Sequence, residues 1–225
     1  RADKRIKGVF SIGEIMRLVS GEYIGFLEPA GTVSRDAFFE NVKLLNQHPE
    51  ADMMYSDEDE IDPNGVRMHP HFKPDWSPDL LLSATYTGSL ALYRRSILVS
   101  LMGFQNLSSW LDQDQTRFST SSLYDLTLQF TERTDAIFHI PKILYHGKAA
   151  FVEDVQRAGM ATKKILETTL RRRNIAGEVL GGIVPGSFRV KRDIIGAPTV
   201  SIIIPTRNRG NVLKKCLESI WEKTR

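Results

Sequence analysis

The sequence predicts an α/β fold, in which short apolar strands alternate along the chain with amphipathic helices. Apolar runs at residues 23–27, 53–56 and 200–204 have the length and the continuity of buried strands. Between the first two of these runs, apolar side chains recur at helical spacing over residues 34–45. A hydrophobic content of 41% and a charged content of 25% are ordinary for a soluble globular protein with a folded core.

The first 173 residues contain start and stop signals for most of the expected elements. Ser11 and Glu14 have capping-box spacing at the start of a helix that Gly21 ends. Ser34 is placed to cap the second helix, and Pro141 separates two short strands. In chain order we expect helix 11–19, strand 23–27, helix 34–45, strand 53–56, strand 89–93, a helix from about 94, a polar surface loop at 105–122, helix 123–133, strands 136–140 and 143–145, and helix 155–173.

The last fifty residues suggest a connection followed by a new unit. Residues 174–199 contain five glycines and two prolines, which is typical of a linker with one or two short strands. The apolar run 200–204 is followed by Pro205 and an amphipathic helix over 212–223, the β–loop–α opening of a parallel sheet. A single βα unit cannot bury its own strand. The segment is therefore expected either to begin a second domain or to dock on the first.

Charge and cysteine usage exclude several classes of protein. The chain has no run of 18 apolar residues, so no membrane-spanning helix is expected. Its single cysteine, Cys216, excludes an internal disulfide and a cysteine-based zinc site. Residues 1–155 carry 15 basic and 22 acidic side chains, whereas residues 156–225 carry 15 basic and 5 acidic. The densest basic cluster, Arg171–Arg173, fits either a solvated helix end or a contact with anionic lipid. No basic motif interleaved with aromatic residues indicates nucleic-acid binding.

Consecutive acidic residues form the most unusual feature of the chain. Asp57, Glu58 and Asp59, with Glu60, directly follow the strand at 53–56. In open α/β sheets, ligands bind beyond the carboxyl ends of the strands, so these acids are expected to lie in a functional loop. A Pro-rich segment then brings Trp76, which either packs against Pro74 and Pro78 or stacks on a bound ligand. We interpret Asp57, Glu58, Asp59 and Trp76 as candidates for substrate binding.

Six segments give a resemblance to a known family. They are GEYIGFLE (21–28), ADMMYSDEDEID (51–62), FKPDWSPDLLLS (72–83), YRRSIL (93–98), YDLTLQFTERT (124–134) and HIPKILYHGK (139–148). In this order and near this spacing they resemble bacterial family-two glycosyltransferases of the GT-A fold, in particular tandem-domain proteins of rhamnan, O-antigen and other surface-polysaccharide synthesis. The segment VSIIIPTRNR (200–209) resembles the first strand and nucleotide-binding loop of a second such domain.

The resemblance implies a mixed sheet flanked by helices, a division of the chain into three parts, and a reaction. Residues 1–150 would be the C-terminal half of one GT-A domain, 151–199 a helix and linker, and 200–225 the start of another. The implied reaction moves a sugar from a nucleotide-sugar donor to a saccharide or lipid-linked acceptor. The implied location is cytoplasmic, with a peripheral position at the inner face of the cell membrane as an option. Because half of the first domain and most of the second would be missing, we expect no turnover from this chain alone.

The family holds its donor through Mg²⁺ or Mn²⁺, hard cations that prefer oxygen ligands. By resemblance the metal-binding candidates here are Glu28, which matches the first acid of the family motif, and His146, which matches a family histidine. The other two acids of that motif are replaced by Ala30 and Gly31, which offer no side-chain ligand. The metal prediction is therefore weaker than the family prediction.

The catalytic carboxylate of the family has no direct counterpart in this chain. Leu123 occupies the matching position, and an apolar side chain cannot act as a general base. Two candidates remain: Asp114, which lies at the right distance after Gly103 and Phe104, and Asp125, which otherwise caps or orients a helix start. Neither is favoured on the sequence.

Two functions follow from these observations. The first is an active glycosyltransferase domain, which the ordered family segments favour. The second is a non-catalytic GT-A scaffold or acceptor-binding module beside an active second domain. The changes at Ala30 and Leu123 favour this second interpretation, as does Ser89, which replaces the histidine of the family's NYxGH segment.

Overall fold

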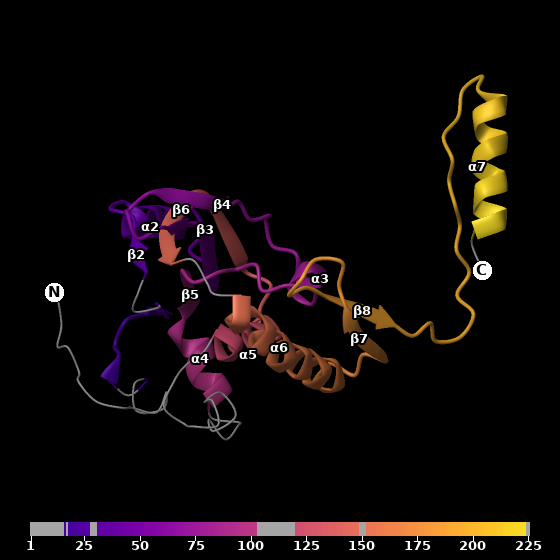
Figure 1. Cartoon of the computed structure of the whole chain (residues 1–225). Coiled ribbons are helices and arrows are strands. Elements are labelled where there is room, and N and C mark those ends of the chain that lie inside the picture. Colours follow the sequence, from indigo (N-terminus) through magenta and orange to yellow (C-terminus); the bar gives the residue numbers. More distant parts are fainter. Residues whose placement is uncertain (1–15, 17, 28–30, 103–119, 149–151, 224–225) are drawn as a thin grey trace. The chain divides into compact units, whose positions relative to one another are not determined.

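The computed structural model describes residue 16 and residues 18–27, 31–102, 120–148 and 152–223 of this chain. Contacts divide the chain into two compact units, Arg1–Arg192 and Asp193–Arg225, and each unit is described by itself. Figure 1 labels the helices and strands. The expected helix at 11–19 and the expected loop at 105–122 lie largely outside the described residues.

The first unit contains strands and helices in alternation, as the sequence predicts. Its strands are β1 (Tyr23–Gly25), β2 (Thr32–Val33), β3 (Met53–Ile61), β4 (Arg67–His71), β5 (Ala91–Arg94), β6 (Ile137–Lys148), β7 (Gly177–Gly181) and β8 (Phe188–Arg192). Its helices are α2 (Ala37–Gln47), α3 (Pro78–Leu81), α4 (Arg95–Met102), α5 (Thr120–Phe130) and α6 (Val152–Arg172). The second unit contains α7 (Gly210–Lys223).

The main sheet is mixed, which confirms the predicted fold class. Its strand order is β1-β5-β3-β6-β2, and β4 pairs with the outer part of β3. Strands β3 and β6 run parallel, whereas β3 pairs antiparallel with both β5 and β4. The register of β3 and β6 shifts after Ser56, where β6 accommodates Pro141 and Lys142. The two strands expected around Pro141 are therefore one strand with an irregularity, a position where proline is tolerated.

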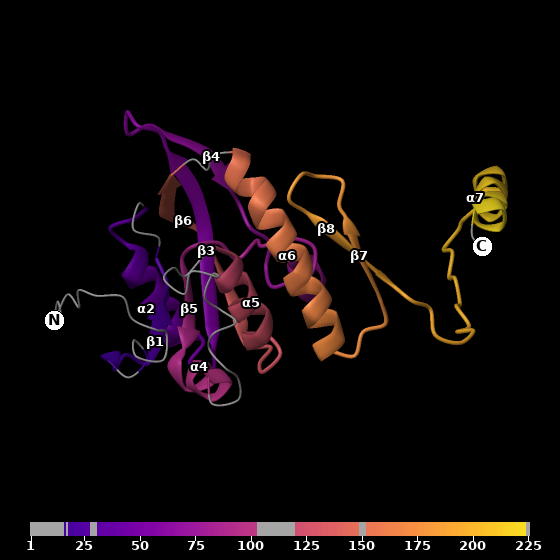
Figure 2. The same cartoon turned by 60° about the horizontal axis from the view of Figure 1, so that its bottom comes forward.

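Helices cover both faces of this sheet. In Figure 2, β3 lies between α2 on one side and α5 and α6 on the other. The larger core cluster is on the α5 and α6 side, where Tyr93 meets Phe130 edge to face at 5.2 Å. A smaller cluster on the α2 side includes Ala37, Leu144 and Tyr145.

The hairpin of β7 and β8 belongs to the first unit. Val179 is buried in the larger core cluster together with Leu166 and Leu170 of α6. The Phe188 amide donates to the Ser83 carbonyl at 2.7 Å, and Arg192 pairs with Asp79 at 2.7 Å. These contacts fasten the hairpin to α3 and to the residues that follow it.

The acids Asp57 to Glu60 lie within β3 and not in a loop after it. The strand continues to Ile61 because β4 pairs on one side of this stretch and β6 on the other. The expectation of a loop was wrong because the backbone here pairs on one side with the neighbouring hairpin strand β4 and on the other with β6, which is distant in the sequence. Four adjacent acids give no sequence signal for a strand of this kind.

Helix α2 forms where the sequence predicts it, but with a different cap and a different buried face. The helix begins after Asp36, and Ser34 donates its hydroxyl to the Asp36 carboxylate instead of capping a backbone amide. The buried residues include Ala37 and Asn41, whereas Phe38, Phe39 and Val42 are exposed.

The second unit has the expected helix but not the expected strand. Residues 200–204 have no strand pairing among the described residues, and Ile203 is 90% exposed. In α7, Trp221 is 89% exposed, and no residue of the helix is buried. A β-strand needs a neighbouring strand for its backbone hydrogen bonds, and the described part of this unit supplies none.

The core assignment predicts a large difference between two phenylalanines. Phe130→Ala removes a fully buried ring and should lower the free energy of unfolding of the first unit by about 3–5 kcal/mol. Phe38→Ala removes a ring that is 61% exposed and should change it by less than about 1 kcal/mol. Urea unfolding followed by circular dichroism measures both. Similar losses for the two variants would contradict the assignment.

Candidate functional site

The acid cluster of β3 alternates between two environments. Asp57 and Asp59 are buried at 3% and 4% exposure, whereas Glu58 and Glu60 are partly exposed. Successive side chains of a strand point to opposite faces of the sheet, so the four carboxylates are divided into two pairs. The two pairs have different surroundings, although Asp57 and Glu58 both contact Lys73, and the cluster does not act as one group of ligands.

A buried ion pair between Lys73 and Glu58 fixes the centre of this region. The Lys73 ammonium lies 3.2 Å from a Glu58 carboxylate oxygen, and the Lys73 side chain is fully buried. The same ammonium donates to the carbonyl of Ser56 at 2.6 Å and to that of Thr87 at 3.1 Å. Glu58 also accepts from the Ser89 amide at 3.0 Å. The pair therefore joins β3 to two loops.

Opposing effects set the pKa values of this pair. Burial raises the pKa of Glu58, but the nearby ring of His71, the charge of Lys73 and the Ser89 amide outweigh burial and bring it to about 2. Burial lowers the pKa of Lys73, and the attraction of Glu58 opposes that shift. The lowered pKa of Glu58 favours a charged pair, whereas the lowered pKa of Lys73 favours a neutral amine. The three acceptors around the ammonium favour a charged Lys73, because a neutral amine would donate fewer bonds.

Gly88 is required where the chain crosses this ion pair. Its φ angle is +76°, a left-handed conformation that glycine adopts easily. A Cβ atom at this position would overlap with the Lys73 ammonium and with the Glu58 carboxylate. The close approach of the backbone therefore depends on the absence of a side chain.

His139 of β6 links the buried acid Asp57 to the segment after β4. One ring nitrogen, Nε2, lies 2.8 Å from Asp57, and the other, Nδ1, lies 3.3 Å from Asp75. The ring is 4% exposed and stacks on Tyr55 with centroids 5.0 Å apart. Asp57 also accepts the Lys73 amide at 2.8 Å. Asp57 is thus held by groups from two other segments.

Sequence analysis did not single out Lys73, Gly88 or His139. Lys73 and His139 lie inside segments of the family resemblance, and Gly88 lies between two of them, so the resemblance is the signal that points to this region. Their importance depends on partners that are distant in the sequence, such as Asp57 for His139, 82 residues away.

The predicted metal ligands do not form a complete site in the described residues. His146 bonds through Nδ1 to Asp59, which also accepts the Arg67 guanidinium at 2.6 Å. Glu28 lies outside the described residues. No group of three or more histidine, cysteine or acidic side chains suited to a metal ion occurs in the parts of the chain that the structure describes. The metal therefore stays a prediction.

Trp76 and the two predicted catalytic acids lie in different settings. The Trp76 ring is partly buried and stacks on Tyr86 at 6.5 Å, so packing accounts for at least one of its faces. Asp125 lies on α5 with the Arg172 guanidinium 3.9 Å away, and Leu123 packs against the core. Asp114 lies outside the described residues.

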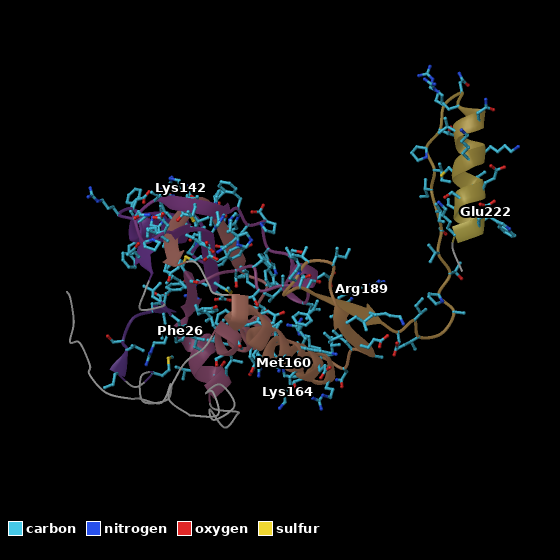
Figure 3. All side chains as sticks on the ribbon, viewed as in Figure 1. Phe26, Lys142, Met160, Lys164, Arg189 and Glu222 are labelled. Carbon is cyan, nitrogen blue, oxygen red and sulfur yellow. The ribbon has the colours of Figure 1, made fainter. Side chains whose placement is uncertain are left out.

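The basic cluster at the end of α6 is partly neutralised. Arg172 and Arg173 both bind Glu132, at 2.7 Å and 2.9 Å, which leaves Arg171 as the exposed member. Figure 3 labels Met160 and Lys164, whose side chains project from the exposed side of the same helix. None of the helices in the described ranges is long and apolar enough to cross a membrane.

The chain has close relatives in sequence. No family model matches it. It is 34% identical over 211 residues to the O-antigen biosynthesis protein RfbC of Myxococcus xanthus, a match that covers 91% of this chain and 16% of that protein. It is 33% identical over 218 residues to the uncharacterized protein y4gI of Sinorhizobium fredii, covering 93% of this chain and 23% of that protein.

These matches confirm the predicted resemblance to bacterial surface-polysaccharide proteins, because one relative has the name of an O-antigen biosynthesis protein. The chain spans less than a quarter of the length of either relative. The activity of the whole protein is therefore a matter for proposal.

Solved structures give weaker likenesses. The crystal structure of Staphylococcus aureus TarS 1–349 has a TM-score of 0.44 and 13% identity, covering 70% of this chain and 48% of that one. The same fragment in complex with UDP-GlcNAc has a TM-score of 0.42 and covers 50% of that chain. Similarity at this level does not establish a shared ligand.

Two glycines with positive φ angles test the crossing over the ion pair. Gly88→Ala should lower the free energy of unfolding by about 1–3 kcal/mol more than Gly65→Ala, because only the first introduces a clash in addition to backbone strain. Gly65 has a φ of +83° and open space around its Cβ position. Urea unfolding measures the difference. Equal losses would show that nothing is crowded at Gly88.

Proposed function

We propose that this chain is part of a glycosyltransferase that moves a sugar from a nucleotide-sugar donor to a growing surface polysaccharide or a lipid-linked acceptor. The observation that carries the proposal is the match over 91% of the chain to an O-antigen biosynthesis protein. The proposed location is cytoplasmic, as the resemblance implies. Residues 200–225, within the second unit, would begin a further domain of the same kind, which would bury the apolar side chains that are exposed here.

The residues around β3 have a positioning role in this proposal. Asp57 and Glu58 are held by Lys73, His139 and the Ser89 amide, so their carboxylates are fixed before any substrate arrives. Groups held in place in this way lower the cost of orienting a bound substrate. Asp59 and Trp76 complete the proposed substrate-binding set. Each of these four side chains has partners within the protein. They would therefore shape the substrate site, and only their exposed atoms would contact the sugar.

The proposed metal is Mg²⁺ or Mn²⁺, which would bind the donor diphosphate. The described residues do not make its site alone, because Asp59 occupies one nitrogen of His146. No step of the reaction is therefore assigned to the metal. The general base would be Asp114 or Asp125, each of which would take the proton of the acceptor hydroxyl as it attacks the sugar.

The alternative is a non-catalytic acceptor-binding module. The packing of Leu123 in the core and the pairing of Asp125 with Arg172 suit this alternative, because both residues then have structural tasks. The comparisons do not favour it.

The direct test is transfer by the native protein that carries this chain. It would be incubated with Mn²⁺ and a panel of labelled nucleoside-diphosphate sugars, and product and free nucleoside diphosphate would be measured. We expect transfer from at least one donor. Asp114→Asn or Asp125→Asn, whichever removes the base, should lower kcat by about 100-fold or more. The exposed Asp36→Asn is the matched control and should leave kcat unchanged.

Calorimetry of nucleoside diphosphate with and without Mn²⁺ separates the two candidates. Metal-dependent binding by a protein that also shows transfer supports the enzyme. Acceptor binding with neither donor binding nor transfer would support the non-catalytic module and contradict the proposal.

A further inference from the structure

The loop that joins β7 to β8 presents two apolar side chains to solvent. Ile183 is fully exposed, and Val184 is 65% exposed. The ten residues 179–188, which contain this loop, carry no charged side chain. Single exposed apolar residues are common on protein surfaces, so exposure alone does not make this loop a binding surface. Its hydrogen bonds and its charged neighbours supply the further evidence. Residues 182–187 are called the hairpin tip below.

The hairpin tip is closed by its own hydrogen bonds. The Gly182 amide donates to the Ser187 carbonyl at 2.9 Å, and the Ser187 amide donates to the Val184 carbonyl at 3.0 Å. The Ser187 hydroxyl donates to the same Val184 carbonyl at 2.6 Å. Gly182 lies so close to Ser187 that a Cβ atom would overlap with it. These polar groups already have partners, so they would not be left without one if the tip entered an apolar layer.

The two faces of the hairpin have different chemistry. Val179 and Val190 pair with each other and pack in the larger core cluster. Successive side chains of a strand point to opposite faces, so the next pair, Leu180 with Arg189, lies on the outer face. The core face fastens the hairpin to the first unit. Contact between the outer face and another surface therefore requires no change in the core.

Basic side chains follow the tip along the outer face. Figure 3 labels Arg189, which is exposed and has no ion pair among the described residues. Lys191 lies 3.1 Å from Glu178 in an exposed pair, which water and salt screen. A strand rises by about 3.4 Å per residue, so these two basic residues lie about 3 Å and about 10 Å behind the last strand pair, Gly181 with Phe188.

The size and the charge of this surface match a lipid bilayer with anionic headgroups. A stable protein interface buries about 1,200–2,000 Å², and two exposed side chains on one loop supply only a small part of that area. A bilayer accepts a small apolar insertion. Its headgroup layer is about 5–7 Å thick on each side, so it would hold Arg189 when the tip reaches the acyl boundary. Negative headgroups attract basic side chains at this short range.

We propose that the β7–β8 hairpin docks the protein on an anionic bilayer, with Ile183 and Val184 inserted at the acyl boundary and Arg189 and Lys191 facing the headgroups. The contact is weak and sensitive to salt, because few side chains supply its apolar and charged parts. It lies on the hairpin and not at the basic end of α6, where Glu132 neutralises two arginines. The docking surface is a property of the hairpin and does not depend on the transfer reaction.

Co-sedimentation with vesicles tests the docking. The native protein that carries this chain is mixed with phosphatidylcholine vesicles, with or without anionic phosphatidylglycerol, at low and at high salt. We expect binding to the anionic vesicles that weakens at high salt. The double variant Ile183→Ser with Val184→Ser should lower the partition coefficient about tenfold, because it removes the inserted side chains. Arg189→Gln should lower it about fivefold, because it removes one charge near the headgroups.

Two exposed residues elsewhere on the first unit provide matched controls. Phe38→Ser removes an apolar side chain that is 61% exposed on α2, and Arg171→Gln removes an exposed basic side chain at the end of α6. Both variants should keep the wild-type partition coefficient. Every substituted side chain is exposed, so all variants are expected to fold, which circular dichroism checks.

Three outcomes would overturn the proposal. The first is unchanged binding of the double variant, or equal binding of the wild type to neutral and anionic vesicles. The second is a loss in Arg171→Gln as large as that in Arg189→Gln, which would place the contact on α6. The third is a wild type that does not bind anionic vesicles. If such a protein formed a dimer that the double variant abolished, a second copy would cover the tip in place of lipid.

Discussion

The buried pair of Lys73 and Glu58 is the interaction on which the rest of the candidate site depends. It joins three stretches of chain that are far apart in the sequence: β3, the segment after β4, and the loop that contains Gly88. Removing one partner of a buried ion pair leaves an uncompensated charge, which typically costs about 3–5 kcal/mol. The pair therefore also fixes the course of the chain around it. Gly88 can lie against the pair only because it lacks a side chain.

This arrangement changes the role that the acid cluster suggests. Four adjacent carboxylates at a strand end look like free ligands for a cation. In the structure, Asp57 is bound by Lys73 and His139, Asp59 by Arg67 and His146, and Glu58 by Lys73 and Ser89. Carboxylates with such partners act mainly to position the surrounding segments.

The sequence predicted those features that depend on local pattern. The alternation of strands and helices, the positions of α5 and α7, and the resemblance to surface-polysaccharide proteins all follow from periodicity or from short ordered motifs. The features that failed depend on pairing partners that lie outside the run itself. A run of acids forms part of β3 only because β4 and β6 flank it, and the apolar run at 200–204 is not a strand because no neighbour is described for it. Lys73 contacts Ser56, 17 residues away, and His139 contacts Asp57, 82 residues away, so their roles emerge only in three dimensions.

The most direct test of the central claim is a double-mutant cycle on the ion pair. The free energy of unfolding at pH 7 would be measured for the wild type, Glu58→Gln, Lys73→Met and the double variant. If the pair organises the region, each single change is costly and the double change costs less than their sum, with a coupling energy of about 1.5–3 kcal/mol. Costs that add to within about 0.5 kcal/mol would show that the two side chains act independently and would contradict this account.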